Sequence, residues 1–261
     1  ERAPPKRQIQ VRFLVTGPIR QFNPSALHGC GTPCAAHWSP ACMLRYPHVL
    51  FDLDGTLIDS APAILASYRE AFVAAACEPV VPIDAGIVGP PLLETLQMLT
   101  GSKDSALLDT LAGHFKASYD NTGYRQTAAY GGVTEMLERL TAAGCTLSIA
   151  TNKRLHPTRL ILDHLGWSRH FAAVYALDAF EPRLPNKAAM IARLMQDRAI
   201  PRDQAIYVGD RSEDGESADA NGLPFLAATW GYGSLEAGEM APHWRAVSTP
   251  AALAEDILAP A

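Results

Sequence analysis

Residues 48–60 read His-Val-Leu-Phe-Asp-Leu-Asp-Gly-Thr-Leu-Ile-Asp-Ser. The first four residues form the apolar run of a buried strand, and Asp52 and Asp54 follow it before a Gly-Thr turn. Two like charges one residue apart repel each other unless a cation or a shared proton lies between them. The pattern therefore predicts a metal site with one nucleophilic carboxylate and one acid/base carboxylate. The simpler alternative is a strand that ends in an acidic turn with no catalytic or metal-binding role.

Downstream of this stretch, short β-rich runs alternate with helical patterns, which is typical of a parallel sheet covered by helices. The predicted strands span 48–52, 145–150, 171–176, 204–209, 224–228 and 245–248. The predicted helices span 61–76, 132–143, 156–165, 187–198, 212–221 and 250–258. We therefore expect an α/β fold, a Rossmann-like parallel sheet with helices on both faces.

The interval between the first two predicted strands is too long for one crossover. More than ninety residues lie there, whereas a simple strand-helix-strand unit needs about thirty in all. The excess, residues 61–130, is rich in helical patterns. It predicts a small helical cap domain inserted after the first strand, with residues 43–60 and 131–261 forming the catalytic core.

The first 42 residues differ from the rest in composition. They hold six prolines and no persistent hydrophobic period, which predicts a disordered or adventitious arm, with Met43 as a candidate natural start. A transit peptide is one alternative, because the arm is rich in arginine and poor in acids. A zinc site is another; its candidate ligands are His28, Cys30, Cys34, His37 and Cys42.

Composition excludes several classes of function. The chain has 261 residues, 48% of them hydrophobic, and a formal charge of −5, and without the basic arm the body carries −9. An acidic body is a poor ligand for nucleic acid, and no apolar run approaches the roughly 18 residues of a membrane span. We expect a cytoplasmic protein with a small-molecule substrate; the oligomeric state is open. Cys77 and Cys145 lie in apolar segments, as small core residues do.

Polar residues recur where the predicted strands end. Thr151 and Asn152 follow the second strand, Asp210 follows the fourth with Asp214 four residues on, and Lys187 opens the helix before it. Strand carboxyl ends share one edge of a parallel sheet, so these groups should meet Asp52 and Asp54 there. Carboxylates suit Mg²⁺, and the hydroxyl, amide and lysine suit phosphoryl oxygens. Singly, each also fits an ordinary role, as a helix cap, a surface lysine or an acid at a helix start.

The order of these motifs resembles that of the haloacid dehalogenase superfamily, over residues 46 to about 240. Tyr130-Gly-Gly-Val and Asn221-Gly-Leu-Pro are similar to its phosphoglycolate phosphatase and 5′-nucleotidase-like branch. The resemblance implies that Asp52 attacks phosphorus and that Asp54 serves as acid and then as base. It further implies phosphate-binding residues and metal ligands. The phosphate-binding residues are Thr151, Asn152 and Lys187, the Mg²⁺ ligands are Asp52, Asp210 and the main-chain carbonyl of Asp54, and Asp214 supports the site.

Two positions depart from the family pattern. Arg154 stands where relatives have proline, and Gly215 replaces an apolar residue, which should loosen that helix start by up to about 1 kcal/mol. In the cap, Gly89 and Pro90 look like the loop that this branch turns toward the active site. Arg69 and Arg125 are further candidates there, because a guanidinium pairs well with a substrate carboxylate.

We therefore expect a Mg²⁺-dependent phosphomonoester hydrolase that acts through an aspartyl-phosphate on small phosphorylated metabolites. Phosphoglycolate is the first expected substrate and nucleoside 5′-monophosphates the second. A phosphomutase has the same core residues, and only the acceptor, water or a sugar hydroxyl, separates it from a hydrolase. A dehalogenase has no use for Asp54 as an acid, and a non-catalytic binding module has no need of the full motif set.

Overall fold

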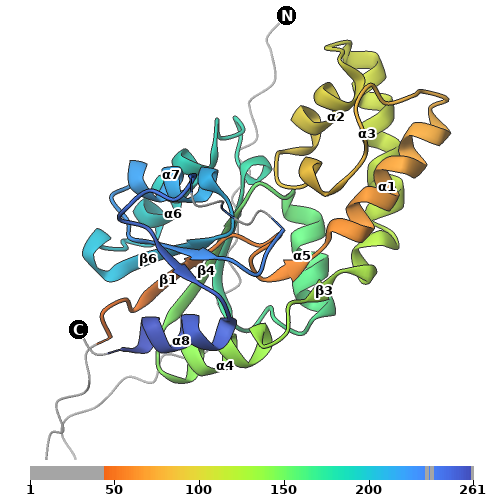
Figure 1. Ribbon diagram of the computed structural model, residues 1–261. Helices are drawn as coiled ribbons and strands as arrows, with labels where there is room; N and C mark the ends of the chain where they lie inside the picture. Colours follow the sequence, from red (N-terminus) through yellow and green to blue (C-terminus); the bar gives the residue numbers. More distant parts are fainter. Residues whose placement is uncertain (1–43, 233–234, 236–237, 260–261) are drawn as a thin grey trace, which may run out of the picture. The chain divides into compact units, whose positions relative to one another are not determined.

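The computed structural model describes residues 44–232, 235 and 238–259 (Figure 1). The predictions made for the arm, and the zinc alternative with its cysteines and histidines, lie outside these residues. The account that follows concerns the unit that begins at residue 42.

A six-stranded sheet forms the centre of the catalytic core, in the order β5-β4-β1-β6-β7-β8, and every neighbouring pair is parallel. Its strands are β1 His48–Phe51, β4 Thr146–Thr151, β5 Phe171–Ala176, β6 Ala205–Gly209, β7 Phe225–Ala228 and β8 Arg245–Val247. All six predicted strands are confirmed, and no strand end differs from its prediction by more than one residue. Because β1 lies between β4 and β6, the carboxyl ends of these three strands are adjacent.

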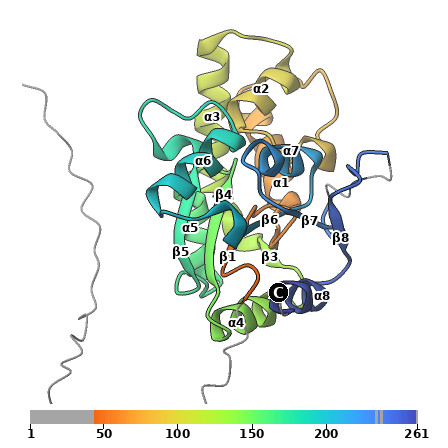
Figure 2. The ribbon, with the colours of Figure 1, turned by 90° about the vertical axis from the view of Figure 1, so that its left-hand side faces the viewer.

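Helices cover both faces of the sheet. The helices of the core are α4 Val133–Ala142, α5 Leu155–His164, α6 Lys187–Asp197, α7 Ser212–Ala220 and α8 Pro250–Leu258. Val49 and Phe51 of β1 pack into one apolar core with α4, α5 and α8, whereas Leu50 packs into a second core with α6 and α7. In Figure 1 and Figure 2, α4 and α8 lie below the strands and α6 and α7 above them. The predicted α/β class is confirmed.

The cap follows β1, as expected. It contains α1 Ala61–Ala74, α2 Leu92–Thr100 and α3 Ser105–Tyr119, which group beside the core in Figure 1. Sequence analysis missed the short antiparallel pair that brackets the cap, β2 Ile58–Asp59 and β3 Ala128–Ala129. Inside the cap, the rings of Tyr68, Phe115 and Tyr119 pack in a row, with successive centroids 4.5 and 5.5 Å apart.

Gly215 has a packing role that the sequence did not reveal. A Cβ at this position would lie 2.4–2.5 Å from ring atoms of Trp244, closer than van der Waals contact allows. The glycine in α7 therefore makes room for the indole. The two cysteines among the described residues are free thiols, Cys145 buried and Cys77 half-buried. Over the part of the chain that the structure describes, no helix is long and apolar enough to cross a membrane.

Candidate active site

The strand ends bring the predicted core residues together. Asp52 follows β1, Thr151 ends β4 and Asp210 follows β6; Lys187 begins α6. All four side chains are buried, and Asp210 has no exposed surface. The parallel sheet thus gathers residues that are up to 158 positions apart in the sequence at one edge.

Three buried carboxylates form one cluster at this edge. Asp52, Asp210 and Asp214 each offer an oxygen within 4.8 Å of the others. Thr56 Oγ1 donates to Asp210 Oδ1 at 3.2 Å, and Asp214 Oδ2 accepts from the main-chain amides of Asp210 and Arg211. The side chain of Asp54 is not part of this cluster; the metal ligand that the sequence predicts at Asp54 is its main-chain carbonyl.

The cluster fits a divalent cation such as Mg²⁺. Its donors are hard oxygens, and Asp52 Oδ1 is buried without a hydrogen-bond partner. Burial raises the pKa of the Asp52 carboxyl well above its usual range; the Lys187 ammonium opposes this shift, and Asp214, Asp210 and Asp54 add to it. A cation at the cluster would favour the ionised form of all three carboxylates.

Lys187 supplies a fixed positive charge beside the first carboxylate. Its Nζ lies 3.1 Å from Asp52 Oδ1 and forms a shorter ion pair with Asp214. Burial alone would lower the pKa of this ammonium, but Asp214 and Asp52 outweigh burial and raise the pKa above its usual range. The side chain therefore remains charged next to Asp52.

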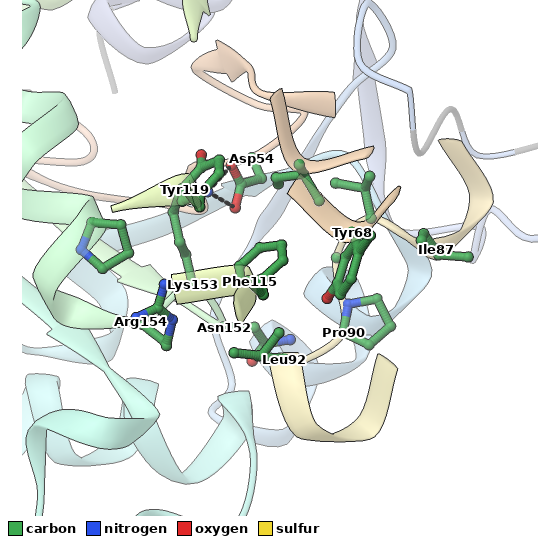
Figure 3. Close-up of a pocket in the computed structure, with 14 residues that line it drawn as sticks. Asp54, Tyr68, Ile87, Pro90, Leu92, Phe115, Tyr119, Asn152, Lys153 and Arg154 are labelled. Carbon is green, nitrogen blue, oxygen red and sulfur yellow. Dashed lines mark hydrogen bonds and ion pairs between the residues drawn. The ribbon is translucent and has the colours of Figure 1, made fainter. Parts of the chain in front are cut away.

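Asp54 is held by a residue that sequence analysis did not single out. Lys153 Nζ lies 3.0 and 3.2 Å from its two carboxylate oxygens, and Ser60 Oγ donates to Asp54 Oδ1. The ammonium also lies 4.7 Å from the centroid of the Tyr119 ring, which belongs to the cap (Figure 3). Burial would lower the pKa of Lys153, but Asp54 and Tyr119 raise it overall. Its position directly after Thr151-Asn152 was the available signal.

The side-chain amide of Asn152, a predicted phosphate-binding group, is hydrogen-bonded to Glu213 in this structure. Asn152 Nδ2 donates to both carboxylate oxygens of Glu213, at 3.1 and 3.2 Å, while Oδ1 has no hydrogen-bond partner. Because the Glu213 carboxylate can only accept hydrogen bonds, the NH2 group of Asn152 must be the one that faces it, which fixes the orientation of the side-chain amide. Thr151 Oγ1 accepts from the main-chain amide of Lys153 at 3.2 Å, and its hydroxyl proton stays free to donate.

A small cavity of about 50 Å³ opens at Asp54, between cap and core. Gly89 and Pro90 line it, as do Tyr68, Phe115 and Tyr119 of the cap (Figure 3). Gly89 has a φ of +127°, and a Cβ there would lie 2.7 Å from Arg211 Nε. Position 89 therefore requires glycine for its backbone conformation and for its close approach to the core. Burial raises the pKa of the Tyr68 hydroxyl to about 12, so this wall of the cavity is uncharged.

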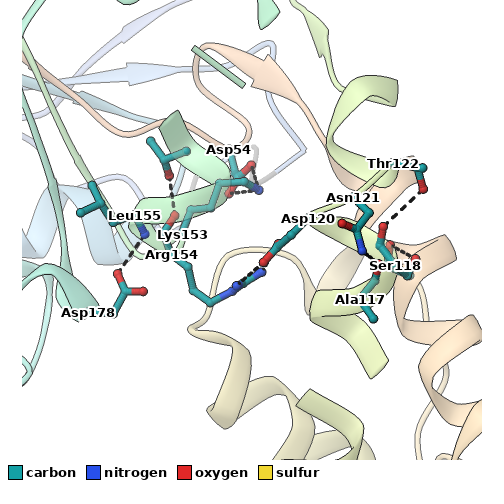
Figure 4. Close-up of polar contacts among 12 residues, drawn as sticks. Asp54, Ala117, Ser118, Asp120, Asn121, Thr122, Lys153, Arg154, Leu155 and Asp178 are labelled. Atoms are coloured by element: carbon teal, nitrogen blue, oxygen red, sulfur yellow. Dashed lines mark hydrogen bonds and ion pairs between the residues drawn. The ribbon is translucent and has the colours of Figure 1, made fainter. Parts of the chain in front are cut away.

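The two cap arginines proposed from the sequence lie elsewhere. Arg69 donates to the carbonyl of Ile83 at 2.8 Å, and Arg125 donates to the Tyr124 hydroxyl at 3.2 Å. Neither lines the cavity at Asp54. Arg154 does: it directly precedes α5 and makes two hydrogen bonds to Asp120 of the cap, at 2.5 and 2.8 Å (Figure 4). Arg154, a departure from the family pattern, is therefore an arginine that lines the cavity at Asp54.

Comparison with known proteins assigns the family. Residues 49–228 match the family described as haloacid dehalogenase-like hydrolases. The chain belongs to this family. The predicted superfamily is confirmed, and the relatives that are named as phosphatases support the predicted phosphatase class.

Relatives of this dehalogenase-like hydrolase include two bacterial phosphatases. A 5′-nucleotidase of Pseudomonas aeruginosa is 33% identical over 192 residues, covering 73% of this chain and 86% of the relative. A phosphoglycolate phosphatase of Xanthomonas campestris is 35% identical over 193 residues, covering 72% and 86%. A crystal structure of a predicted phosphatase from Clostridium acetobutylicum superimposes with a TM-score of 0.72 at 30% identity, covering 82% and 98%.

One relative is described by a different activity. The tyrosine-protein kinase PtkA of Mycobacterium tuberculosis is 36% identical over 189 residues, covering 72% of this chain and 64% of that protein. The same hydrolase-like core therefore occurs in proteins named for phosphate release and in one named for phosphoryl transfer.

Proposed function

We propose that this enzyme is a Mg²⁺-dependent phosphomonoester hydrolase that acts through an aspartyl-phosphate. The observation that carries the proposal is Asp52, a buried carboxylate at the end of β1 whose Oδ1 lies 3.1 Å from Lys187 Nζ and has no hydrogen bond. A nucleophilic carboxylate must be ionised and desolvated. Asp52 is buried, and the Lys187 ammonium beside it favours the ionised form.

Asp52, Asp210 and the main-chain carbonyl of Asp54 would hold Mg²⁺, with Asp214 in support. The ion, when bound, supplies positive charge that offsets the carboxylates and the phosphoryl oxygens. Monoester hydrolysis requires up to about 10²¹-fold acceleration, so charge placed in advance around the phosphoryl group must provide most of the effect. Lys187 contributes such a charge from the protein, and the Thr151 hydroxyl provides a donor.

In this mechanism Asp52 attacks phosphorus in line with the leaving oxygen. Asp54 gives a proton to that oxygen, and the aspartyl-phosphate forms on Asp52. Asp54 then takes a proton from water, which attacks phosphorus and releases phosphate. Lys153 and Ser60 would orient the Asp54 carboxyl during both steps. The ring row of Tyr68, Phe115 and Tyr119 would keep bulk water away from the intermediate.

The substrates we propose are small phosphorylated metabolites. The names of the two phosphatase relatives make 2-phosphoglycolate and nucleoside 5′-monophosphates the first to test. Phosphoryl transfer to a hydroxyl, as in a mutase or a kinase, uses the same residues and differs only in the acceptor. Measuring free phosphate against transfer to an added sugar phosphate separates these outcomes.

Asp52→Asn is the test of the proposal. We expect a loss of at least about 10³-fold in kcat, because an amide is not a nucleophile of comparable strength, with an unchanged circular dichroism spectrum. Asp59→Asn is the matched control: Asp59 Oδ1 accepts from the main-chain amide of Ala61 at 3.2 Å, a contact that asparagine retains. If the Asp52 variant kept a tenth of the wild-type activity, the nucleophile would have to be assigned elsewhere.

A further inference from the structure

The segment that follows β7 packs against the turn that follows Asp54. A Cβ on Gly231 would lie far closer to the carbonyl oxygen of Gly55 than van der Waals contact allows, so the two backbones touch directly. One residue earlier, Trp230 Nε1 donates to the carbonyl of Thr56 at 2.9 Å. These two contacts fix the position of the next residue, Tyr232, whose ring packs against the main apolar core.

Ser60 stands at the start of α1, but its side chain does not cap the helix. Serine at such a position ordinarily accepts a hydrogen bond from a main-chain amide of the first turn. The Ser60 side chain makes no such bond. Its hydroxyl donates instead to Asp54 Oδ1, and its oxygen lies 3.4 Å from the Tyr232 hydroxyl. This buried hydroxyl therefore serves the carboxylate and not the helix.

The chemistry of the groups sets the direction of both hydrogen bonds. An ionised carboxylate can only accept, so the Ser60 proton points to Asp54. Because a hydroxyl has a single proton, Ser60 must accept from Tyr232. Burial, with the Asp54 charge adding to it, raises the pKa of the Tyr232 hydroxyl above its usual range. The phenol therefore keeps its proton, and a chain of donors runs from Tyr232 through Ser60 to Asp54.

The two carboxylate oxygens of Asp54 have different surroundings. Oδ1 accepts from the Ser60 hydroxyl and lies 3.0 Å from Lys153 Nζ. Over the described part of the chain, the hydrogen-bond donor to Oδ2 is Lys153 Nζ alone, at 3.2 Å. A proton on Oδ1 would have to displace the Ser60 proton, whereas a proton on Oδ2 would not. Oδ2 is therefore the oxygen that can carry a proton to a substrate.

We propose that Tyr232 is a positioning residue for the acid/base step: it holds the Ser60 hydroxyl on Asp54 Oδ1 and so leaves Oδ2 to exchange the proton. The inference rests on the proposed phosphomonoester hydrolysis. In the first step the Oδ2 proton passes to the leaving oxygen while its bond to phosphorus breaks and the bond from Asp52 to phosphorus forms. In the second step Oδ2 takes a proton from the attacking water while the bond from Asp52 to phosphorus breaks. Tyr232 and Ser60 keep their own protons throughout.

Leaving groups that differ in their need for a proton test the proposal. An alkoxide leaves phosphorus poorly unless it is protonated, whereas acetate leaves acetyl phosphate as a stable anion. Acetyl phosphate is therefore compared with two alkyl monoesters, 2-phosphoglycolate, which is similar to it in size, and uridine 5′-monophosphate. All three compounds are assayed with the wild type, Tyr232→Phe, Ser60→Ala and the double variant.

Tyr175→Phe is the matched control. Tyr175 in β5 also donates its hydroxyl to a carboxylate, Asp197 Oδ2 at 2.9 Å, in an exposed pair. The control therefore removes the same atom and the same kind of hydrogen bond away from Asp54.

We expect kcat/KM for the alkyl monoesters to fall about 10-fold in Tyr232→Phe, a part of the roughly 10²–10⁴-fold that general acid catalysis contributes. For acetyl phosphate, and for all substrates in the control, the change should stay below about 2-fold. In a Ser60→Ala background, Tyr232→Phe should have no further effect, because Tyr232 acts through that hydroxyl. This second comparison needs only one alkyl monoester.

Equal changes for all three substrates, or none, would overturn the proposal while leaving hydrolysis intact, and so would full additivity of the two substitutions. A wild type that acts on acetyl phosphate alone would also overturn it, because no leaving group would then take the proton of Asp54. A wild type that releases phosphate from none of the three compounds would instead refute the proposed function.

Discussion

Replacing Gly215 by alanine should destabilise this protein, although alanine ordinarily stabilises a helix relative to glycine. The added Cβ would lie 2.4 Å from Trp244 Cζ2 and 2.5 Å from Cε2 and Cη2. The indole cannot easily move away: its Nε1 donates to Asp219 Oδ2 at 3.0 Å, and its ring packs against Phe225 with centroids 5.2 Å apart. Alanine must therefore displace either the indole or the helix.

The expected magnitude follows from two opposing effects. Overpacking a well-filled site costs roughly 1–3 kcal/mol, and the gain in helix propensity returns about 1 kcal/mol, so the free energy of unfolding should fall by about 1 kcal/mol. Gly113→Ala is the matched control, because Gly113 lies within α3 and a Cβ there meets nothing within 4 Å. That variant should gain about 0.5–1 kcal/mol from the same change.

Thermal unfolding followed by circular dichroism measures both variants. In a protein of this size 1 kcal/mol corresponds to a shift of about 2–4 °C in Tm, so the two variants should move in opposite directions by resolvable amounts. In a Trp244→Ala background the penalty at position 215 should disappear. A Gly215→Ala variant that is stabilised as much as Gly113→Ala would refute the packing argument.

Three further predictions concern the Mg²⁺ requirement, the ion pair between cap and core, and the stability of the protein at low pH. Activity should be lost in excess chelator and restored by Mg²⁺, and Asp210→Asn should raise the Mg²⁺ concentration needed for half-maximal activity; full activity in chelator would contradict the metal cluster. The Arg154–Asp120 pair, at 18% and 16% exposure, should show a coupling of roughly 1–2 kcal/mol in an alanine double-mutant cycle of unfolding, and additivity would show that the pair contributes nothing. Burial, with Arg169 adding to it, lowers the pKa of the His170 imidazole below its ordinary 6.5. The folded protein therefore binds this proton less tightly than the unfolded chain does, so the free energy of unfolding should fall as the pH decreases through 6.5. The His170→Gln variant should lose less stability than the wild type between about pH 7 and pH 5.

The sheet and the core of the site were predictable because both depend on local patterns. An apolar run of four to six residues followed by a polar one is visible in sequence, and His48–Phe51 with Asp52 is such a run. In a parallel sheet, the ends of such runs meet without any knowledge of side-chain packing. The positions of Thr151, Lys187 and Asp210 follow from this geometry.

Other features depend on contacts that no local pattern encodes. β2 and β3 have two residues each, too few for a period to appear, and they form because the chain enters and leaves the cap at neighbouring points. Arg69 and Arg125 were candidates only because they carry the suitable charge. Each instead donates to a group of the cap, which their place in the sequence does not reveal.

Lys153 illustrates why the site is more than its motif residues. It lies 99 positions from Asp54 in the sequence, yet its ammonium contacts both oxygens of that carboxylate and faces the Tyr119 ring. One contact belongs to the core and the other to the cap, and water is largely excluded from both, since the Lys153 side chain is 6% exposed. Attraction between charges strengthens as water leaves, so the hold of Lys153 on Asp54 depends on Tyr119 remaining in place. The closed cap and the orientation of the proposed acid/base carboxyl are therefore linked through a single side chain.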